Sequence, residues 1–168
     1  MENTKENIKI RPQQIDDAER FCKILNNENF KYFDVRPTLK EEIEFIKQNE
    51  KNIKNNFQHN FTILYNNKII GSVGVKIDQH RTHIGELGYF IDENYWGKGL
   101  AIKAVKLLEN YCFNKLNLKR LIIVMAIENK ASEKIAIKCN YKKEGTMKQC
   151  FKIFNKYHDA YLYAKIPK

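Results

Sequence analysis

Residues 121–127 read Leu-Ile-Ile-Val-Met-Ala-Ile, seven consecutive apolar side chains. A short, β-branched run of this kind is typical of a strand that is buried on both faces of its sheet. Such a strand needs helices on both sides, so it predicts an α/β fold. The run is far shorter than the ~20 residues of a membrane-spanning helix, and the opening MENTKENIKIRPQQ has no apolar core for a signal peptide. We therefore expect a soluble, cytoplasmic protein.

The patterns on either side of this run predict one folding unit over residues 1–168. From Gly99 onward apolar residues recur with the period of a helix, and Asn129 begins another helix. Strand, helix and buried strand in succession form a right-handed crossover, so the strands ending at Ile91 and Ile127 should be parallel neighbours. Further strands are predicted at residues 8–12, 61–65, 68–75 and 84–91, and two more within 144–166.

Two more helices are predicted near the start of the chain. Asp16 or Asp17 can cap the first, and Thr38 with Glu41 three residues on forms a capping box for the second. One face of the second helix should be lined by Leu39, Ile43 and Ile46. No linker or repeat interrupts these elements, so a single mixed sheet with helices on both faces is expected.

The segment 94–101, Asn-Tyr-Trp-Gly-Lys-Gly-Leu-Ala, joins a predicted strand to a predicted helix. Gly97 and Gly99 leave backbone N–H groups unhindered at the positive end of that helix, which favours binding of an anion. A dinucleotide fingerprint would need glycine where Ile102 stands, and the P-loop spacing is also missing. A glycine turn that merely starts a helix is the alternative.

Four segments together resemble the GNAT superfamily of N-acetyltransferases. They are GELGYFID (85–92), YWGKGLA (95–101), ENKAS (128–132) and KCNYKKEG (138–145). The resemblance is greatest to the branch with ribosomal-protein N-terminal acetyltransferases and spermidine acetyltransferases, and it spans nearly the whole chain. It implies a single-domain, mostly antiparallel twisted sheet, with a splayed pair of parallel strands that binds acetyl-CoA.

The resemblance also implies which residues bind acetyl-CoA. The pantetheine arm would pair with the backbone near Tyr89, Phe90 and Ile91, and the pyrophosphate would accept N–H groups from the helix start. Asn129 would lie close to the pantetheine, although asparagine is also a favoured helix cap. Trp96 replaces the usual Gln or Arg, and it contacts the cofactor or only packs beside it. The implied cofactor-binding residues are Tyr89, Phe90, Ile91, Trp96, Gly97, Lys98, Gly99, Leu100, Ala101 and Asn129.

Acetyl transfer to an amine needs a base, because a free alkyl ammonium has a pKa of ~10. Glu86 lies in the middle of a predicted strand beside the expected thioester, and burial would raise its pKa toward the working range. A solvated Glu86, or one paired with a lysine, is the alternative. Backbone N–H near Phe90 would stabilise the oxyanion. Many relatives have a tyrosine as general acid at the position where this chain has Ala136. Ser132 is therefore the first candidate for the general acid, and Tyr141 and Tyr157 are weaker candidates.

The net charge is +10, from 30 basic and 20 acidic residues, and a field of this sign attracts polyanions in general. The acidic residues of the second helix could attract a polyamine or a basic peptide end, and the acceptor stays open among a protein N terminus, a polyamine, an amino sugar and an antibiotic amine. An acetyl-CoA-binding but inactive module and a basic nucleic-acid-binding domain are the alternatives to an enzyme.

The spacing of the four cysteines and four histidines indicates free thiols and no metal, and a homodimer is possible.

Overall fold

One seven-stranded sheet runs through the protein, with strand order β1-β2-β3-β4-β5-β7-β6. The structure is a computed structural model that describes residues 7–167. In this part of the chain β4 and β5 are parallel, and the other neighbouring strands are antiparallel. The strands are β1 (Ile8–Pro12), β2 (Gln58–Tyr65), β3 (Lys68–Ile77), β4 (Ile84–Ile91), β5 (Arg120–Ala126), β6 (Lys142–Ile153) and β7 (Lys156–Lys165).

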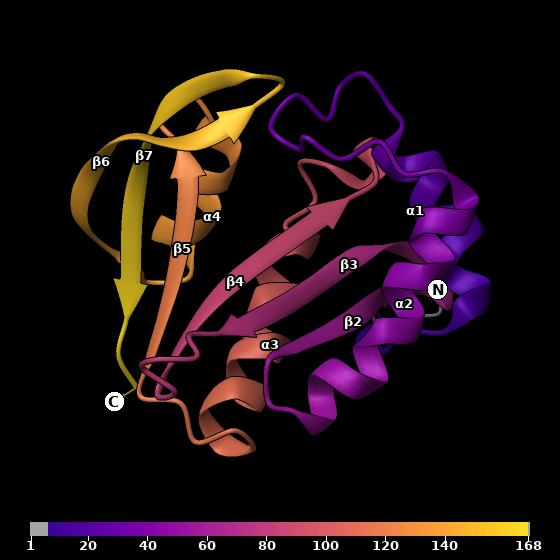
Figure 1. Ribbon diagram of the computed structural model, residues 1–168, viewed down its shortest axis with the longest axis horizontal. Coiled ribbons are helices and arrows are strands. Elements are labelled where there is room, and N and C mark those ends of the chain that lie inside the picture. Colours follow the sequence, from indigo (N-terminus) through magenta and orange to yellow (C-terminus); the bar gives the residue numbers. More distant parts are fainter. Residues whose placement is uncertain (1–6, 168) are drawn as a thin grey trace, which may run out of the picture.

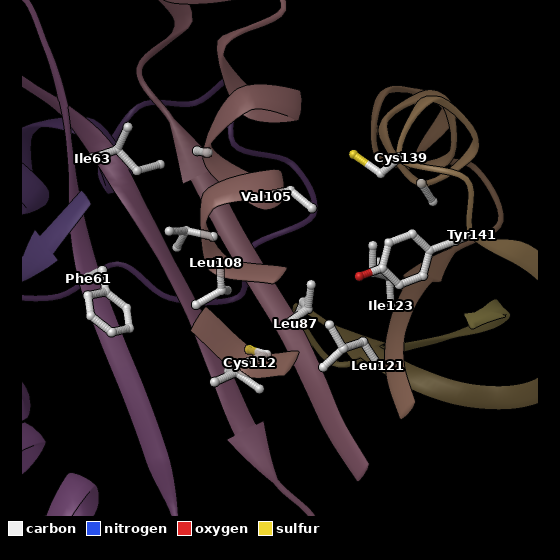
Figure 2. Close-up of a cluster of buried hydrophobic side chains, with 14 of the residues drawn as sticks. Phe61, Ile63, Leu87, Val105, Leu108, Cys112, Leu121, Ile123, Cys139 and Tyr141 are labelled. Atoms are coloured by element: carbon white, nitrogen blue, oxygen red, sulfur yellow. The ribbon is translucent and has the colours of Figure 1, made fainter. Parts of the chain in front are cut away.

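Helices cover both faces of the sheet, as Figure 1 shows. On one face α1 (Ala18–Leu25) packs against β3 and α2 (Leu39–Lys54) against β2. On the other face α3 (Leu100–Asn114) packs against β1, β3 and β4, and α4 (Lys130–Lys138) packs against β5. The main core lies between the sheet and these last two helices (Figure 2). The predicted single α/β domain, its strands and its parallel pair are therefore confirmed.

The predicted capping box at the second helix is also confirmed. Thr38 Oγ1 accepts the N–H of Glu41, and the Glu41 carboxylate accepts the N–H of Thr38, which is the reciprocal capping box at the start of α2. Between β2 and β3, Asn66 and Asn67 take φ values of 48° and 63°. Asparagine tolerates this left-handed region better than most residues, so the Asn-Asn pair makes a two-residue hairpin turn.

The predicted capping of α1 by an aspartate is right for the position of Asp17 and wrong for the role of its side chain. A 3-10 turn (Ile15–Asp17) precedes α1, and Asp17 stands at the cap position without a side-chain cap bond. Its buried carboxylate instead binds the guanidinium of Arg11 at 2.6 and 2.8 Å and accepts from the Thr62 hydroxyl at 2.5 Å. Asp17 therefore ties the start of α1 to β1 and β2.

The predicted apolar face of α2 is only partly right. Ile46 is buried, but Leu39 is 48% exposed, and the side chains buried with Ile46 are the polar Glu42 and Asn49. Asn49 donates to the carbonyl of Asn60 at 3.1 Å and accepts its N–H at 3.1 Å, so the helix is joined to β2 by hydrogen bonds. Desolvation raises the pKa of Glu42.

The prediction that β5 is buried on both faces holds for one face. Leu121, Ile123 and Met125 are at most 2% exposed on the α3 and α4 side, whereas Ile122 and Val124 on the opposite side are only partly buried. The difference arises because α1 and α2 contact β2 and β3 and stop short of β5. At β5, the face of the sheet that carries Ile122 and Val124 is therefore not covered by a helix in the described part of the chain.

The outer strand β6 forms the C-terminal edge of the sheet. Its pairing with β7 is interrupted at Lys143/Gly145 and at Met147/Phe151, and Gln149 has a φ of 48°. Bulges and lysines on an edge strand oppose pairing with a second chain. The homodimer expected from this edge stays a prediction that the strand itself does not favour.

Within residues 7–167, no helix is long and apolar enough to cross a membrane. Over the same residues, no group of three or more His, Cys, Asp or Glu side chains could hold a metal ion. The four cysteines, Cys22, Cys112, Cys139 and Cys150, are free thiols.

Asp17→Asn should lower the free energy of unfolding by about 2–3 kcal/mol at neutral pH, because it removes a buried partner of a charged group. Burial pushes the pKa of Asp17 upward, but hydrogen bonds from Arg11, Thr62 and Gln14 outweigh it, and the pKa lies below its usual value. A lowered folded-state pKa means that this stability is present above the unfolded pKa of ~3.9 and is lost as the pH falls through the folded pKa.

Urea unfolding of the wild type and of Asp17→Asn across pH 7 to 2 measures both effects. Asp16→Asn, at an exposed neighbouring position, is the control and should unfold like the wild type. A difference between wild type and Asp17→Asn that does not shrink in acid would contradict the assignment.

Candidate active site

The site is built around a gap between the parallel strands β4 and β5. They pair only at Ile84↔Arg120, Gly85↔Leu121 and Glu86↔Ile122, and then diverge toward their C-terminal ends (Figure 1). Beyond Glu86, β4 remains paired with β3, and β5 remains paired with β7. One edge of β4 therefore faces an opening inside the sheet.

Backbone groups of β4 point into this opening. The carbonyl of Ile84 accepts the N–H of Asp78 on the β3 side, and successive residues of a strand alternate. Leu87, Tyr89 and Ile91 accordingly direct their backbone groups toward the gap, whereas Phe90 directs its own toward Ser72 on β3. An extended ligand with amide groups, such as a pantetheine arm, can pair with the edge of Leu87 and Tyr89.

At the end of β4 the chain turns into α3 through two glycines in the left-handed region. Gly97 has a φ of 76° and Gly99 a φ of 72°, and a Cβ at either position would have no atom within 4 Å. Gly99 is the N-cap of α3 and provides no side-chain cap, and the Lys103 N–H is bonded to its carbonyl. The N–H groups at Leu100, Ala101 and Ile102 precede this first helical bond and are available to an anion.

The N-terminus of α4 lies across the gap from β4. Asn129 is its N-cap, and its side-chain oxygen accepts the N–H of Ser132 at 3.1 Å. The Ser132 hydroxyl lies 2.8 Å from the phenol oxygen of Tyr89, which reaches over from β4. Desolvation raises the pKa of Tyr89 to about 12, so the phenol is neutral at physiological pH. Ala136, one turn along the same face, is fully buried.

Glu86 projects from β4 on the opposite side of the sheet from Tyr89, toward the face that carries α1. It lies across from Lys76 in the β3–β4 register and is open to solvent. Enough protein surrounds the carboxylate that desolvation raises its pKa, and the charge of Lys76 opposes this effect. Next along this face come Gly88, which leaves open space, and Phe90. The result is a carboxylate with an elevated pKa beside the open space at Gly88.

Residues 7–142, which contain all of these features, match the family described as the acetyltransferase (GNAT) domain. The chain belongs to this family of acetyltransferases. The resemblance found in the sequence motifs, and the enzyme class that it implied, are thereby confirmed.

Relatives of this GNAT domain cover most of its length. The N-acetyltransferase p20 of Bacillus licheniformis is 26% identical over 97% of this chain and 94% of its own. A spermidine N(1)-acetyltransferase of Escherichia coli (strain K12) is 26% identical over 91% of this chain and 82% of its own. A solved ribosomal L7/L12 α-N-protein acetyltransferase in complex with coenzyme A superposes with a TM-score of 0.87, at 20% identity, over 95% of this chain and 93% of its own.

Two of the predicted cofactor-binding side chains of the acetyltransferase have partners within the protein. The indole N–H of Trp96 donates to the carbonyl of Ile91 at 2.7 Å, and its ring packs on Phe30 at 5.7 Å. The ammonium of Lys98 donates to the carbonyl of Asn94 at 3.2 Å and lies over the ring of Tyr95. These contacts correspond to the packing alternative for Trp96 and hold Lys98 against its own loop.

The weaker candidates for a general acid lie away from the gap. Tyr141 is 4% exposed and packs in the core beside Ile123, as Figure 2 shows. Its hydroxyl is next to Glu109, and burial raises its pKa well above the usual range. Tyr157 is 64% exposed at the start of β7. Ser132 is the predicted acid that lines the gap.

The acidic face predicted on α2 is largely engaged in other contacts. Glu41 is occupied by the capping box with Thr38, Glu42 is buried, and Glu44 pairs with Lys47 at 2.9 Å. These contacts reduce the free carboxylate on the helix, and Glu50, the fourth acidic residue expected to attract a cationic acceptor, is exposed without such a contact among residues 7–167. The idea that α2 recognises a polyamine is weakened accordingly.

An aromatic wall was missed by the sequence analysis. Phe21 from α1 meets Phe90 edge-on at 5.6 Å, and Phe33 from the loop before α2 meets it at 5.9 Å. Phe30 contacts Phe90 and also bridges to Trp96. The members come from three separate stretches with no shared spacing, so the sequence carries no local signal for the wall. It encloses the end of the face on which Glu86 lies.

Proposed function

We propose that the protein transfers the acetyl group of acetyl-CoA to a primary amine by direct attack of the amine on the thioester. The observation that carries the proposal is the gap between β4 and β5 that ends at the uncapped start of α3. A backbone edge beside a cluster of free N–H groups suits a ligand with an amide-rich arm and a pyrophosphate. Bound acetyl-CoA supplies an acetyl thioester.

The backbone of Leu87 and Tyr89 would hold the pantetheine arm, and the N–H groups from Gly97 to Ala101 would hold the pyrophosphate. Leu100 is 1% exposed, so it contributes its N–H and anchors the helix start in the core. The side chain of Asn129 is already bonded to Ser132 and shapes the far wall of the gap. This arrangement revises the expected contact at Phe90, whose backbone lies on the β3 side.

Glu86 would accept the proton of the attacking amine, directly or through water. Its raised pKa brings the carboxylate closer to the working pH than an ordinary glutamate, which makes it a better base. Ser132, on the other side of the gap, would lie near the sulfur and assist its departure. Glu86 and Ser132 are thus on opposite faces of the same opening.

The state of the cysteines supports direct attack over a covalent acyl-cysteine. Cys112 and Cys139 are buried, and desolvation raises their pKa to about 12 and about 11. Neutral, buried thiols are poor nucleophiles. Their reduced state, together with that of Cys22 and Cys150, is consistent with a cytoplasmic enzyme.

The acceptor would enter through a hollow of about 370 Å³ at the end of β5. Its walls come from the loop before α2, from Glu128 and from the turn between β6 and β7. Tyr32 and Glu128 are joined in this wall, where the Tyr32 hydroxyl donates to the Glu128 carbonyl at 3.0 Å. A larger hollow of about 630 Å³ is lined only by residues of 12–16 and of α2, away from β4, β5 and α4. Spermidine and a protein N terminus, which relatives acetylate by name, are the first acceptors to test.

Release of coenzyme A thiol on addition of a primary amine to enzyme and acetyl-CoA tests the proposal. We expect release with at least one of spermidine, an N-terminal peptide, an amino sugar and an aminoglycoside. Binding of acetyl-CoA without release across this panel would favour the inactive module. Salt-dependent binding of an oligonucleotide in place of acetyl-CoA would favour the nucleic-acid alternative.

Acetyl-CoA at a hundredfold excess over its dissociation constant should raise the thermal midpoint of the wild type by roughly 5–10 °C. Gly99→Ala should weaken this binding about tenfold, because a side chain costs ~1–2 kcal/mol in the left-handed region, and a ligand-free loop that relieves this strain must return to the strained conformation to present its N–H groups. Gly145→Ala is the matched control, since Gly145 has equally open surroundings without a positive φ. Equal affinity in the two variants would contradict an anion site at the start of α3.

Glu86→Gln should reduce thiol release at least tenfold with little change in acetyl-CoA affinity, because an amide cannot accept the amine proton. Initial rates at saturating acetyl-CoA measure the effect. Glu19→Gln, on the exposed surface of α1, should keep the wild-type rate. A wild-type rate in Glu86→Gln would remove this residue as the base.

Lys76→Met should move the acidic limb of the kcat/KM profile to higher pH. The charge of Lys76 lowers the pKa of Glu86, so its removal raises that pKa and leaves the base protonated up to a higher pH. Lys68→Met, on an exposed position of the same strand, is the control. An acidic limb that stays in place would mean that a group other than Glu86 sets it.

A further inference from the structure

A pair of hydroxyl groups joins the two sides of the gap. The phenol of Tyr89 on β4 and the hydroxyl of Ser132 on α4 are 2.8 Å apart, although 43 residues separate them in the chain. Other tyrosines near α4 have different partners: the Tyr163 hydroxyl donates to Glu133 at 2.9 Å, and that of Tyr141 lies next to Glu109. Tyr89 is thus the tyrosine bonded to the predicted acid.

Either oxygen can donate in this hydrogen bond, and the chemistry of the two groups favours the phenol as donor. A phenol is the more acidic donor, and a serine hydroxyl rotates freely until a partner fixes it. Tyr89 keeps its proton at neutral pH, and neighbouring Cys139, whose pKa is about 11, is also neutral. The phenol can therefore donate to Ser132 Oγ, and the serine proton then points elsewhere.

The backbone of Ser132 is fixed as well. Its N–H is held by the Asn129 side chain at the first turn of α4. With the N–H and the hydroxyl oxygen both engaged, the remaining freedom of Ser132 is the direction of its own proton. The hydroxyl lies where Tyr89 reaches from β4 to the start of α4, beside the gap between the strands.

We propose that Tyr89 is a positioning residue, which donates to Ser132 and turns the serine proton toward the sulfur of the bound coenzyme. The inference rests on the proposed acetyl transfer. In that reaction the bond from nitrogen to the acetyl carbon forms, the bond from carbon to sulfur breaks, and the electron pair goes to sulfur. Glu86 takes the amine proton, the Ser132 hydroxyl donates a hydrogen bond to the thiolate, and solvent later protonates it.

Coenzyme A itself is the probe that needs no acceptor. We expect the wild type to lower the pKa of the bound coenzyme thiol by about one unit relative to free coenzyme, through the hydrogen bond from Ser132. Ultraviolet absorbance of the thiolate across a pH series measures it. Tyr89→Phe and Ser132→Ala should each abolish the shift, and the double variant should lose no more than either one.

Tyr163→Phe is the matched control, because it removes another phenol that joins a strand to α4 at Glu133. It should leave the thiol pKa at its wild-type value. Thermal midpoints without ligand show whether any variant is merely unfolded. The proposal would be overturned if the wild type did not lower the pKa of the bound thiol, or if Tyr89→Phe still lowered it. It would also be overturned if Tyr163→Phe lost the effect equally, or if coenzyme A did not bind.

Kinetics supply the second measurement. Tyr89→Phe should lower kcat about tenfold with an unchanged KM for acetyl-CoA, and the loss should not add to that of Ser132→Ala. Additive losses, or a change confined to KM, would show that Tyr89 does not act through Ser132. If the wild type acetylates no amine, that failure falls on the proposed function, and the thiol titration still decides the role of Tyr89.

Discussion

The separation of β4 from β5 after three residue pairs is the constraint on which the rest of the structure depends. Backbone N–H and C=O groups at the interior of a sheet are costly to leave without partners, so a gap of this kind implies that something bonds to its edge. The surrounding elements are arranged around it. The start of α3 lies at its end, α4 closes one side, and Glu86 lies where the strands begin to part.

Much of the fold was predictable because its signals are local. The apolar run at residues 121–127, the capping box at Thr38 and the helix start at Gly99 each depend on residues a few positions apart. The exceptions are long-range. Propensity favours Asp17 as a helix cap, yet the partners of its carboxylate, Arg11 and Thr62, lie on two strands, and propensity carries no information about such contacts.

The candidate site divides in the same way. Its backbone part, which consists of the glycines and the free strand edge, could be inferred from the glycine motif and from the succession of strand, helix and strand. The side-chain part could not, because Tyr89 and Ser132 meet across the gap and the aromatic wall at Phe90 is assembled from separate segments. The pattern of the strand predicts partial burial of Glu86, and the structure differs. The residue is open to solvent, and its raised pKa comes from the surrounding protein and is moderated by Lys76 on the next strand.

The hydrogen bond from the Trp96 indole to the Ile91 carbonyl has a consequence for the ligand-free protein. An unpaired strand edge is a template that can recruit another chain. Here the indole occupies one end of the edge, and pairing of Glu86 with Ile122 closes the other. The stretch that remains is too short for a second strand to add, so the enzyme can keep an opening in its sheet without exposing a seed for aggregation.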